Sequence, residues 1–229
     1  MKKTSLIVLS ALLVLFTFTA CKSNPEKGLL DRYFNAITLN DMSTLSTMAL
    51  EPMTMEVDSW KVTKVSEEKI EPAKLPDLNT QEMEFKKKME AHIEPVMKAK
   101  DALDAAKDEY DTARTGGARG AAKVKVDAAQ KAYDEEYSLH NELKKGYNDA
   151  KAAAQKEEDI TYFSLGVKDL ASIRDLKGTI HNKDVEVAVT DKAGAVKNFS
   201  LKMIMYSLKD EAQNLNHRGR WVITKFTAI

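Results

Sequence analysis

The chain has 229 residues and carries 35 basic and 35 acidic side chains, so its formal charge at neutral pH is zero. This balance argues against nucleic acid as a partner, because such binding relies on an excess of lysine and arginine. The single cysteine excludes an internal disulfide, so stability has to come from packing.

Residues 1–20 have the pattern of an export signal. Two lysines precede an apolar run, and the small residues Thr19 and Ala20 stand before Cys21. This arrangement resembles the lipobox of bacterial lipoproteins. The resemblance implies cleavage between Ala20 and Cys21 and attachment of a diacylglyceryl group and an acyl chain such as palmitate to Cys21. The alternatives are an ordinary secretory signal with an incidental cysteine and an uncleaved membrane anchor.

The same resemblance implies a location in the cell envelope. No second apolar run reaches the ~20 residues that cross a bilayer, so attachment would rest on the lipid. Lys22, and not aspartate, follows the cysteine, which resembles outer-membrane sorting in enteric bacteria. We therefore expect a lipoprotein on the periplasmic face of the outer membrane. Residues 21–28 are polar and contain proline and glycine, so they predict a short tether.

The segment after the tether predicts two short helices, a strand and a loop. Apolar residues recur at helical spacing on both sides of Asn40 and Asp41, which favour a capped corner. These residues are Leu29, Leu30, Tyr33, Phe34, Ile37, Leu45, Met48 and Leu50. Alternation from Met53 to Val65 predicts a strand with a bulge near Asp58. Prolines and charges over residues 66–79 predict a loop.

Residues 80–158 are rich in Ala, Lys, Glu and Asp and predict an antiparallel helical hairpin around a glycine-rich turn. Each arm of about 35 residues carries small or apolar side chains at alternating spacings of four and three, the seam of a coiled coil. Facing residue numbers sum to about 235. The facing pairs include Ala113 with Ala122, Tyr110 with Val126, Ala106 with Ala129, Leu103 with Tyr133, and Phe85 with Ala150. Pro95 predicts a kink or a break, in which case residues 92–94 form a linker.

Beyond residue 158 the composition reverts, and the sequence predicts one or two helical turns followed by three strands. The strands run from Gly178 to Thr190, from Val196 to Lys209 and from Arg220 to Ile229. The second is apolar on both faces, so it should be central and covered on both sides. The polar stretch from Asp210 to Gly219 predicts a loop.

Two opening helices, a strand and a terminal antiparallel meander that ends in Arg-Gly-Arg-Trp-Val-Ile-Thr-Lys-Phe form a recognisable order. This order resembles the nuclear transport factor two-like, or cystatin-like, fold, mainly over Leu29 to Leu50 and Asp184 to Phe226. The resemblance implies an α+β domain, formed by residues 29–79 and 159–229, in which N-terminal helices pack on an antiparallel sheet. The hairpin over 80–158 would be an insertion. The resemblance implies no active site.

Two groups of residues were weighed as metal sites. His92, Glu136 and His140 occupy neighbouring layers of the seam, but zinc usually takes three or four convergent ligands, and polar seam residues commonly set register. We therefore expect no metal there. Four methionines are expected to fill gaps in the core and not to bind copper. They are Met42, Met48, Met53 and Met55.

No constellation of residues predicts catalysis. Tyr33, Asp58 and Tyr206 are the residues considered for a pocket between the sheet and the opening helices, but tyrosine at such positions is more often part of the core. His181 and His217 fall where solvent exposure is expected. The sequence has no glycine-rich phosphate loop and no nucleophile-elbow motif. We expect no catalytic residue, no cofactor and no enzymatic activity.

The hairpin is a better candidate for the functional part of the protein than the pocket. Its seam is mostly alanine and buries little apolar area, so Ile93, Met97 and Tyr137 on its outer faces are expected to find other contacts. The hypothesis is a lipid-anchored protein that binds or scaffolds another envelope protein through this hairpin. The alternatives are ligand binding or catalysis in the pocket of the cystatin-like domain, self-association through the hairpin, and a solvated spacer.

Overall fold

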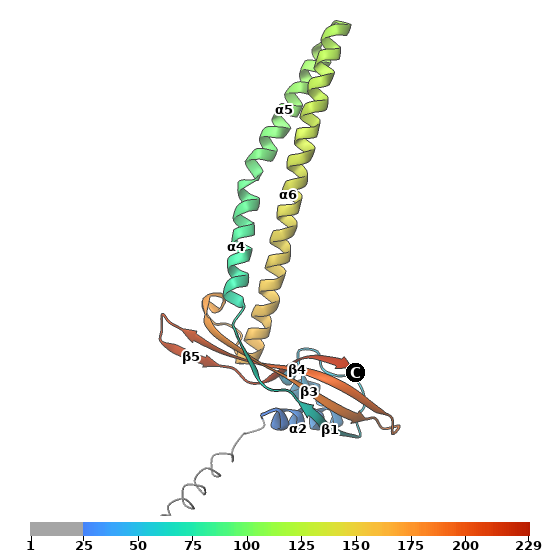
Figure 1. Ribbon diagram of the computed structural model, residues 1–229, viewed down its shortest axis with the longest axis vertical. Coiled ribbons are helices and arrows are strands. Elements are labelled where there is room, and N and C mark those ends of the chain that lie inside the picture. Colours follow the sequence, from blue (N-terminus) through green and yellow to red (C-terminus); the bar gives the residue numbers. More distant parts are fainter. Residues whose placement is uncertain (1–24) are drawn as a thin grey trace, which may run out of the picture. The chain divides into compact units, whose positions relative to one another are not determined.

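The computed structural model describes residues 25–229 and shows a mixed helix and sheet protein with a curled antiparallel sheet and one long helix (Figure 1). The described chain divides into two compact units. Unit 1 contains residues 25–68, 182–204 and 221–229, and unit 2 contains residues 69–181 and 205–220. The unit boundaries therefore differ from the domain boundaries drawn from the sequence.

The predicted signal peptide over 1–20 and the lipid site at Cys21 lie outside the described residues. Of the predicted tether, the part from Pro25 onward is described and forms the first turn of helix α2 (Pro25–Thr38). Proline at the first helical position and Glu26 in the first turn both favour a helix start. Within residues 25–229 no helix is both long and apolar enough to cross a membrane.

The two predicted opening helices are confirmed in unit 1. Helix α2 is followed by α3 (Met42–Met48), and the chain turns at Asn40, whose φ is 53°. The Asp41 carboxylate accepts a hydrogen bond from the backbone N–H of Thr44 at 3.0 Å and caps α3. The corner therefore forms where the polar pair interrupts the apolar spacing.

The first strand is shorter than predicted. Strand β1 (Ser59–Val65) pairs antiparallel with the C-terminal part of β3 (Lys177–Thr190), and its irregularity falls between Val62 and Lys64 and not near Asp58. The segment that begins at Met53 is not a strand, because its backbone has another partner. The N–H of Met53 donates to the Tyr33 hydroxyl at 2.7 Å.

The predicted terminal strands are confirmed. Strand β4 (Val196–Asp210) pairs with β3, and β6 (Val222–Ala228) pairs with the β4 segment 199–204. Side chains on both faces of β4 are buried, as its apolar composition predicted. They include Leu201, Met203, Ile204, Met205, Tyr206 and Leu208.

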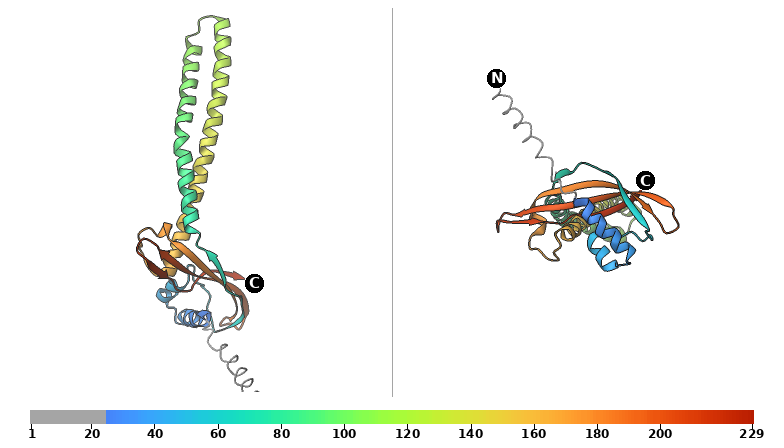
Figure 2. Two further views of the ribbon diagram at one scale, coloured as in Figure 1. Left: turned by 60° about the vertical axis from the view of Figure 1, so that its left-hand side comes forward. Right: turned by 90° about the horizontal axis from the view of Figure 1, so that it is seen from below.

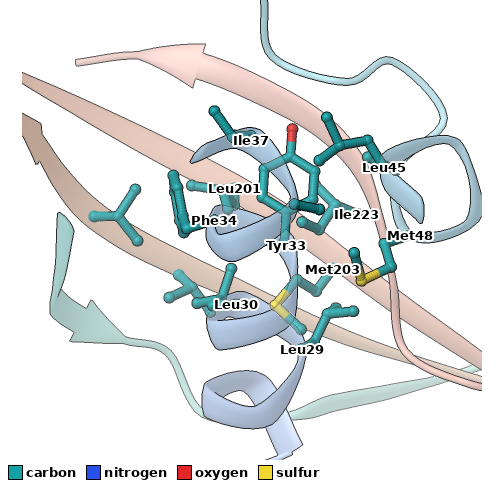
Figure 3. Packing of buried hydrophobic residues seen from close by; sticks show 14 of the residues in the cluster. Leu29, Leu30, Tyr33, Phe34, Ile37, Leu45, Met48, Leu201, Met203 and Ile223 are labelled. Carbon is teal, nitrogen blue, oxygen red and sulfur yellow. The ribbon is translucent and has the colours of Figure 1, made fainter. Parts of the chain in front are cut away.

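The core of unit 1 lies between α2, α3 and one face of the sheet (Figure 3). Leu30 and Tyr33 are completely buried, and Phe34 is 1% exposed. The Phe34 ring stacks on Trp60 with centroids 4.6 Å apart, and the Tyr33 ring stacks on Phe226 at 5.4 Å. The spacing of apolar residues in α2 therefore does place one helix face on the sheet.

Unit 2 contains two short strands that the sequence analysis placed in loops. Strand β2 (Lys69–Pro72) pairs with β3, and β5 (Leu215–Arg218) pairs with β4. Nearly all their side chains are exposed, so neither strand shows the apolar alternation that marks a half-buried strand. The prediction of loops at 66–79 and 210–219 was wrong for this reason.

Three helices make up most of unit 2. They are α4 (Leu75–Ala91), α5 (Ile93–Thr112) and α6 (Gly116–Leu165). Figure 1 and the left view of Figure 2 show α6 beside α4 and α5, which run in the opposite direction. A short 3-10 helix, η2 (Ile173–Asp175), follows α6. Helices α4 and α5 form one arm and α6 forms the other, and we call the two arms together the helical pair.

The first arm breaks at one residue, His92, and not over a three-residue linker. Helix α5 begins at Ile93 and accommodates Pro95 in its first turn, where the missing N–H costs no hydrogen bond. Near the turn the contacts agree with the predicted register, because Lys125 Nζ lies 2.6 Å from Glu109 Oε1. Beyond the break the Phe85 ring lies against Gly146, one helical turn from its predicted partner Ala150 on α6.

Candidate functional site

The space between α2 and the sheet of unit 1 is filled by side chains. Tyr33, one of the residues considered for a pocket, belongs to this core, and Asp58 lies at the surface. A surface pocket of about 420 Å³ occurs elsewhere in unit 1, where Lys192 Nζ and Glu56 Oε2 form an ion pair at 3.4 Å. Its lining consists of Met55, Glu56, Asp191, Lys192, Ala193 and Lys197.

Because Tyr33 is buried, the pH at which its hydroxyl loses its proton tests the packing of the unit 1 core. Loss of solvent raises the pKa of its hydroxyl to about 12, although the Met53 N–H lowers it. The folded state therefore holds this proton more tightly than the unfolded state. The resulting stability is complete below pH 10 and is lost as the pH rises through 12. We expect the free energy of unfolding to fall between pH 10 and pH 12, and to fall less in Tyr33→Phe.

Denaturant titrations across this pH range measure the effect. Tyr137→Phe is the matched control, because that ring is 49% exposed. A pH dependence of Tyr33→Phe equal to that of the wild-type protein would contradict the assignment.

The three residues considered for a metal site meet only in part. His92 Nε2 lies 2.9 Å from Glu136 Oε2, and the rings of His92 and His140 stack with centroids 6.1 Å apart. The Nδ1 atoms of both histidines are buried and have no hydrogen-bond partner. Among residues 25–229 no group of three or more His, Cys, Asp or Glu side chains could hold a metal ion. His92, Glu136 and His140 thus form a polar contact between the two arms at the level of the helix break.

The other methionines and histidines named from the sequence do not form one cluster. Met48 is buried in the unit 1 core, Met53 and Met55 pack against it, and Met42 is 57% exposed. His181 and His217 were expected to be exposed, but both are half-buried. His217 lies in β5 opposite Leu208 of β4, and this strand pairing limits its exposure.

A charged clamp at the base of the helical pair was missed by the sequence analysis. Arg174 in η2 donates to Glu82 of α4 at 2.7 Å and to Glu158 of α6 at 2.8 Å. The two carboxylates are only 11% and 14% exposed. Hydrogen bonds to the carboxylates of Glu158 and Glu82 raise the pKa of Arg174. An isolated arginine after a loop gives no sequence signal for such a role.

A second buried contact in unit 2 involves Tyr206. Its hydroxyl donates to Glu157 Oε1 at 2.7 Å, and its N–H donates to the hydroxyl of Ser164 at 3.2 Å. Burial first, and the negative charge of Glu157 next, raise the pKa of Tyr206. Both partners lie in α6, so this tyrosine fixes the end of the long helix on β4.

Unit 1 contains a third buried charge that the sequence did not reveal. Lys183 Nζ is 3.1 Å from Glu26 Oε2 and 3.8 Å from Glu68 Oε2, and it lies over the ring of Trp221 at 5.6 Å. The side chains of Lys183 and Glu26 are 14% and 8% exposed. This lysine fixes the first turn of α2, the point at which the described chain begins.

The outer surface of the helical pair carries apolar residues without cover. Ile93, Met97 and Tyr137 are 51%, 52% and 49% exposed, and the Tyr137 ring stacks on Tyr133 at 5.7 Å. Ile93 follows His92 and Tyr137 follows Glu136, two residues that contact each other. In antiparallel helices, residues that follow facing residues lie on the same side of the pair. We call Ile93, Met97 and Tyr137 the mid-helix face.

Comparison with known proteins gives no relative: no family model, no curated protein and no solved structure matches the chain.

Proposed function

We propose that this protein is a lipid-anchored cell-envelope protein that binds or scaffolds a partner through its helical pair and that it is not an enzyme. The proposal includes a cystatin-like fold with the helical pair as an inserted coiled-coil hairpin. Two helices that pack on one sheet face, followed by the antiparallel strands β3, β4 and β6, support the first part. The opposed directions of α5 and α6 and the contacts between them support the second.

The anchor is tested on the full chain. We expect the wild-type protein in the outer-membrane fraction and Cys21→Ser in the soluble periplasmic fraction, because a thioether-linked lipid requires the thiol. A metabolic fatty-acid label should appear on the wild-type protein alone. Retention of Cys21→Ser in the membrane would contradict the lipoprotein assignment and favour an uncleaved anchor.

The exposure of the mid-helix face is the main observation that supports the binding role. Within α4, α5 and α6 few apolar side chains are fully buried. They are Leu75, Leu103, Ala106, Ala122 and Ala154, and three of the five are alanine. A seam of alanine contributes little apolar area, at about 25 cal/mol per Å². Several large apolar side chains of the pair are instead exposed, among them Ile93, Met97 and Tyr137, and these are available to a partner.

Capture from detergent-solubilised envelope tests this role. We compare the intact protein with Ile93→Ser/Met97→Ser/Tyr137→Ser, whose exposed substitutions should leave the fold intact. Val124→Ser/Leu139→Ser is the matched control, because these two side chains of α6 are also exposed, at 69% and 45%. We expect a captured protein that is lost with the mid-helix face and kept with the control. An identical captured set for all three proteins would contradict the binding role and leave the helical pair as a spacer.

A further inference from the structure

A stripe of six exposed side chains follows one side of α4 and α5 at spacings of four, three, four, three and four residues. These spacings keep side chains on one helix face. The six residues are Lys86, Glu90, Ile93, Met97, Lys100 and Asp104. His92, at the break, keeps right-handed helical angles with φ −85° and ψ −4°, so the stripe continues across it. We call these six residues the α4–α5 stripe.

The chemistry of the stripe is ordered as base, acid, apolar, apolar, base, acid. Two copies laid antiparallel along this stripe place every side chain opposite a complementary one. Lys86 opposes Asp104, Glu90 opposes Lys100, and Ile93 opposes Met97. Two parallel copies would place lysine opposite lysine and acid opposite acid, which is unfavourable.

We propose that the α4–α5 stripe binds a second copy of this chain in antiparallel orientation. This rests on the proposed function and names the partner of the mid-helix face. The centre of the stripe lies between Ile93 and Met97, and this is also the middle of the segment from Leu75 to Thr112. Two antiparallel copies in this register therefore overlap over residues 78–112, which is nearly the full length of α4 and α5. A chance set of exposed residues would not be centred on the middle of the α4–α5 segment. It would also not carry complementary charges on both sides of that centre.

The remaining groups around the stripe are compatible with this contact. Lys100 forms an ion pair with Asp104 of its own chain, and both side chains are 52% exposed. An exposed ion pair of this kind contributes little free energy. Lys100 and Asp104 can therefore pair with residues of a second copy at little cost. Tyr137 lies on the same side of the helical pair as Ile93, because they follow Glu136 and His92, which contact each other, and its ring stacks on Tyr133. Tyr137 therefore adds apolar surface to the same contact.

Charge exchange along the stripe tests the orientation on the full chain in density-matched detergent. Lys86→Glu/Lys100→Glu places acid opposite acid at four points of a dimer, and we expect dimer dissociation to become at least about tenfold easier by sedimentation equilibrium. Addition of Glu90→Lys/Asp104→Lys to that variant restores complementarity with reversed signs, so we expect the dimer to return. Lys87→Glu/Lys123→Glu is the control, because these exposed lysines lie outside the stripe. Failure of the fourfold variant to recover the dimer would overturn the charge pairing.

Cysteine cross-linking tests the register. Met83 and Lys107 are exposed and lie equally far from the centre of the stripe. We expect a disulfide-linked dimer when Met83→Cys and Lys107→Cys proteins are mixed, and not from either alone. The wild-type protein is the background for Cys21. A cross-link within Met83→Cys alone would overturn the antiparallel arrangement.

Two further outcomes separate this inference from the proposed function. A protein that is monomeric at all concentrations, but whose mid-helix face captures a different envelope protein, would overturn the second copy and leave the binding role standing. A monomer that captures nothing would overturn both.

Discussion

Phe34→Ala should lower the free energy of unfolding by about 3–5 kcal/mol, the cost of removing a large aromatic side chain from a close-packed core. Phe34 is 1% exposed and contacts aromatic rings on two sides. Its ring stacks on Trp60 at 4.6 Å and meets the Tyr33 ring edge-on at 5.4 Å. Removal of the ring leaves a cavity that these rigid neighbours fill poorly.

Denaturant unfolding monitored by circular dichroism measures this loss. Met42→Ala on α3 is the control, because Met42 is 57% exposed and its truncation should change stability by no more than about 0.5 kcal/mol. Equal stabilities of the two variants would contradict the packing of α2 on the sheet.

Arg174→Met should cost about 3 kcal/mol, because it leaves Glu82 and Glu158 charged, largely buried and without their cation. Most of this loss of stability should come from the two buried carboxylates that no longer have a cation, and less from the lost contacts of the arginine itself. We therefore expect Arg174→Leu/Glu82→Leu/Glu158→Leu to recover most of the stability, since an apolar cluster of similar volume replaces the buried charges.

Lys177→Met is the matched control for the clamp. Its ion pair with Glu211 spans 3.9 Å between side chains that are 74% and 66% exposed, so it should change stability very little. Arg174→Met with the stability of Lys177→Met would show that the clamp does not hold the base of the helical pair.

The parts of the fold that follow from the sequence are those in which one face is buried. In α2, the residues from Leu29 to Ile37 repeat at helical spacing because one side of the helix enters the core, and β4 is apolar throughout because both its faces are covered. In the helical pair, the spacing of four and three residues indicated two long antiparallel arms even though many positions of the pattern are alanine. The predicted limits of α2 and β4 lie within a few residues of the observed ones, whereas the helices predicted over 80–158 run from Leu75 to Leu165.

The parts that the sequence could not predict depend on contacts between distant residues. Strands β2 and β5 are short and exposed, so only their pairing with β3 and β4 defines them. The partners of Arg174 lie 92 and 16 residues away. Pro95 indicated a break in the first arm but not its position at the single residue His92. The mid-helix face, in contrast, was named from the sequence because its residues lie outside the seam.

A photo-reactive amino acid at position 97, in the full chain and in living cells, tests the binding role of the helical pair most directly. Met97 is the most exposed residue of the mid-helix face, and position 139 on α6 serves as the control because Leu139 is exposed to a similar degree. We expect a discrete cross-linked product from position 97, of the size of two chains or of one chain with a partner, and none from position 139. Identical products from both positions, or none from either, would contradict a binding surface on the helical pair.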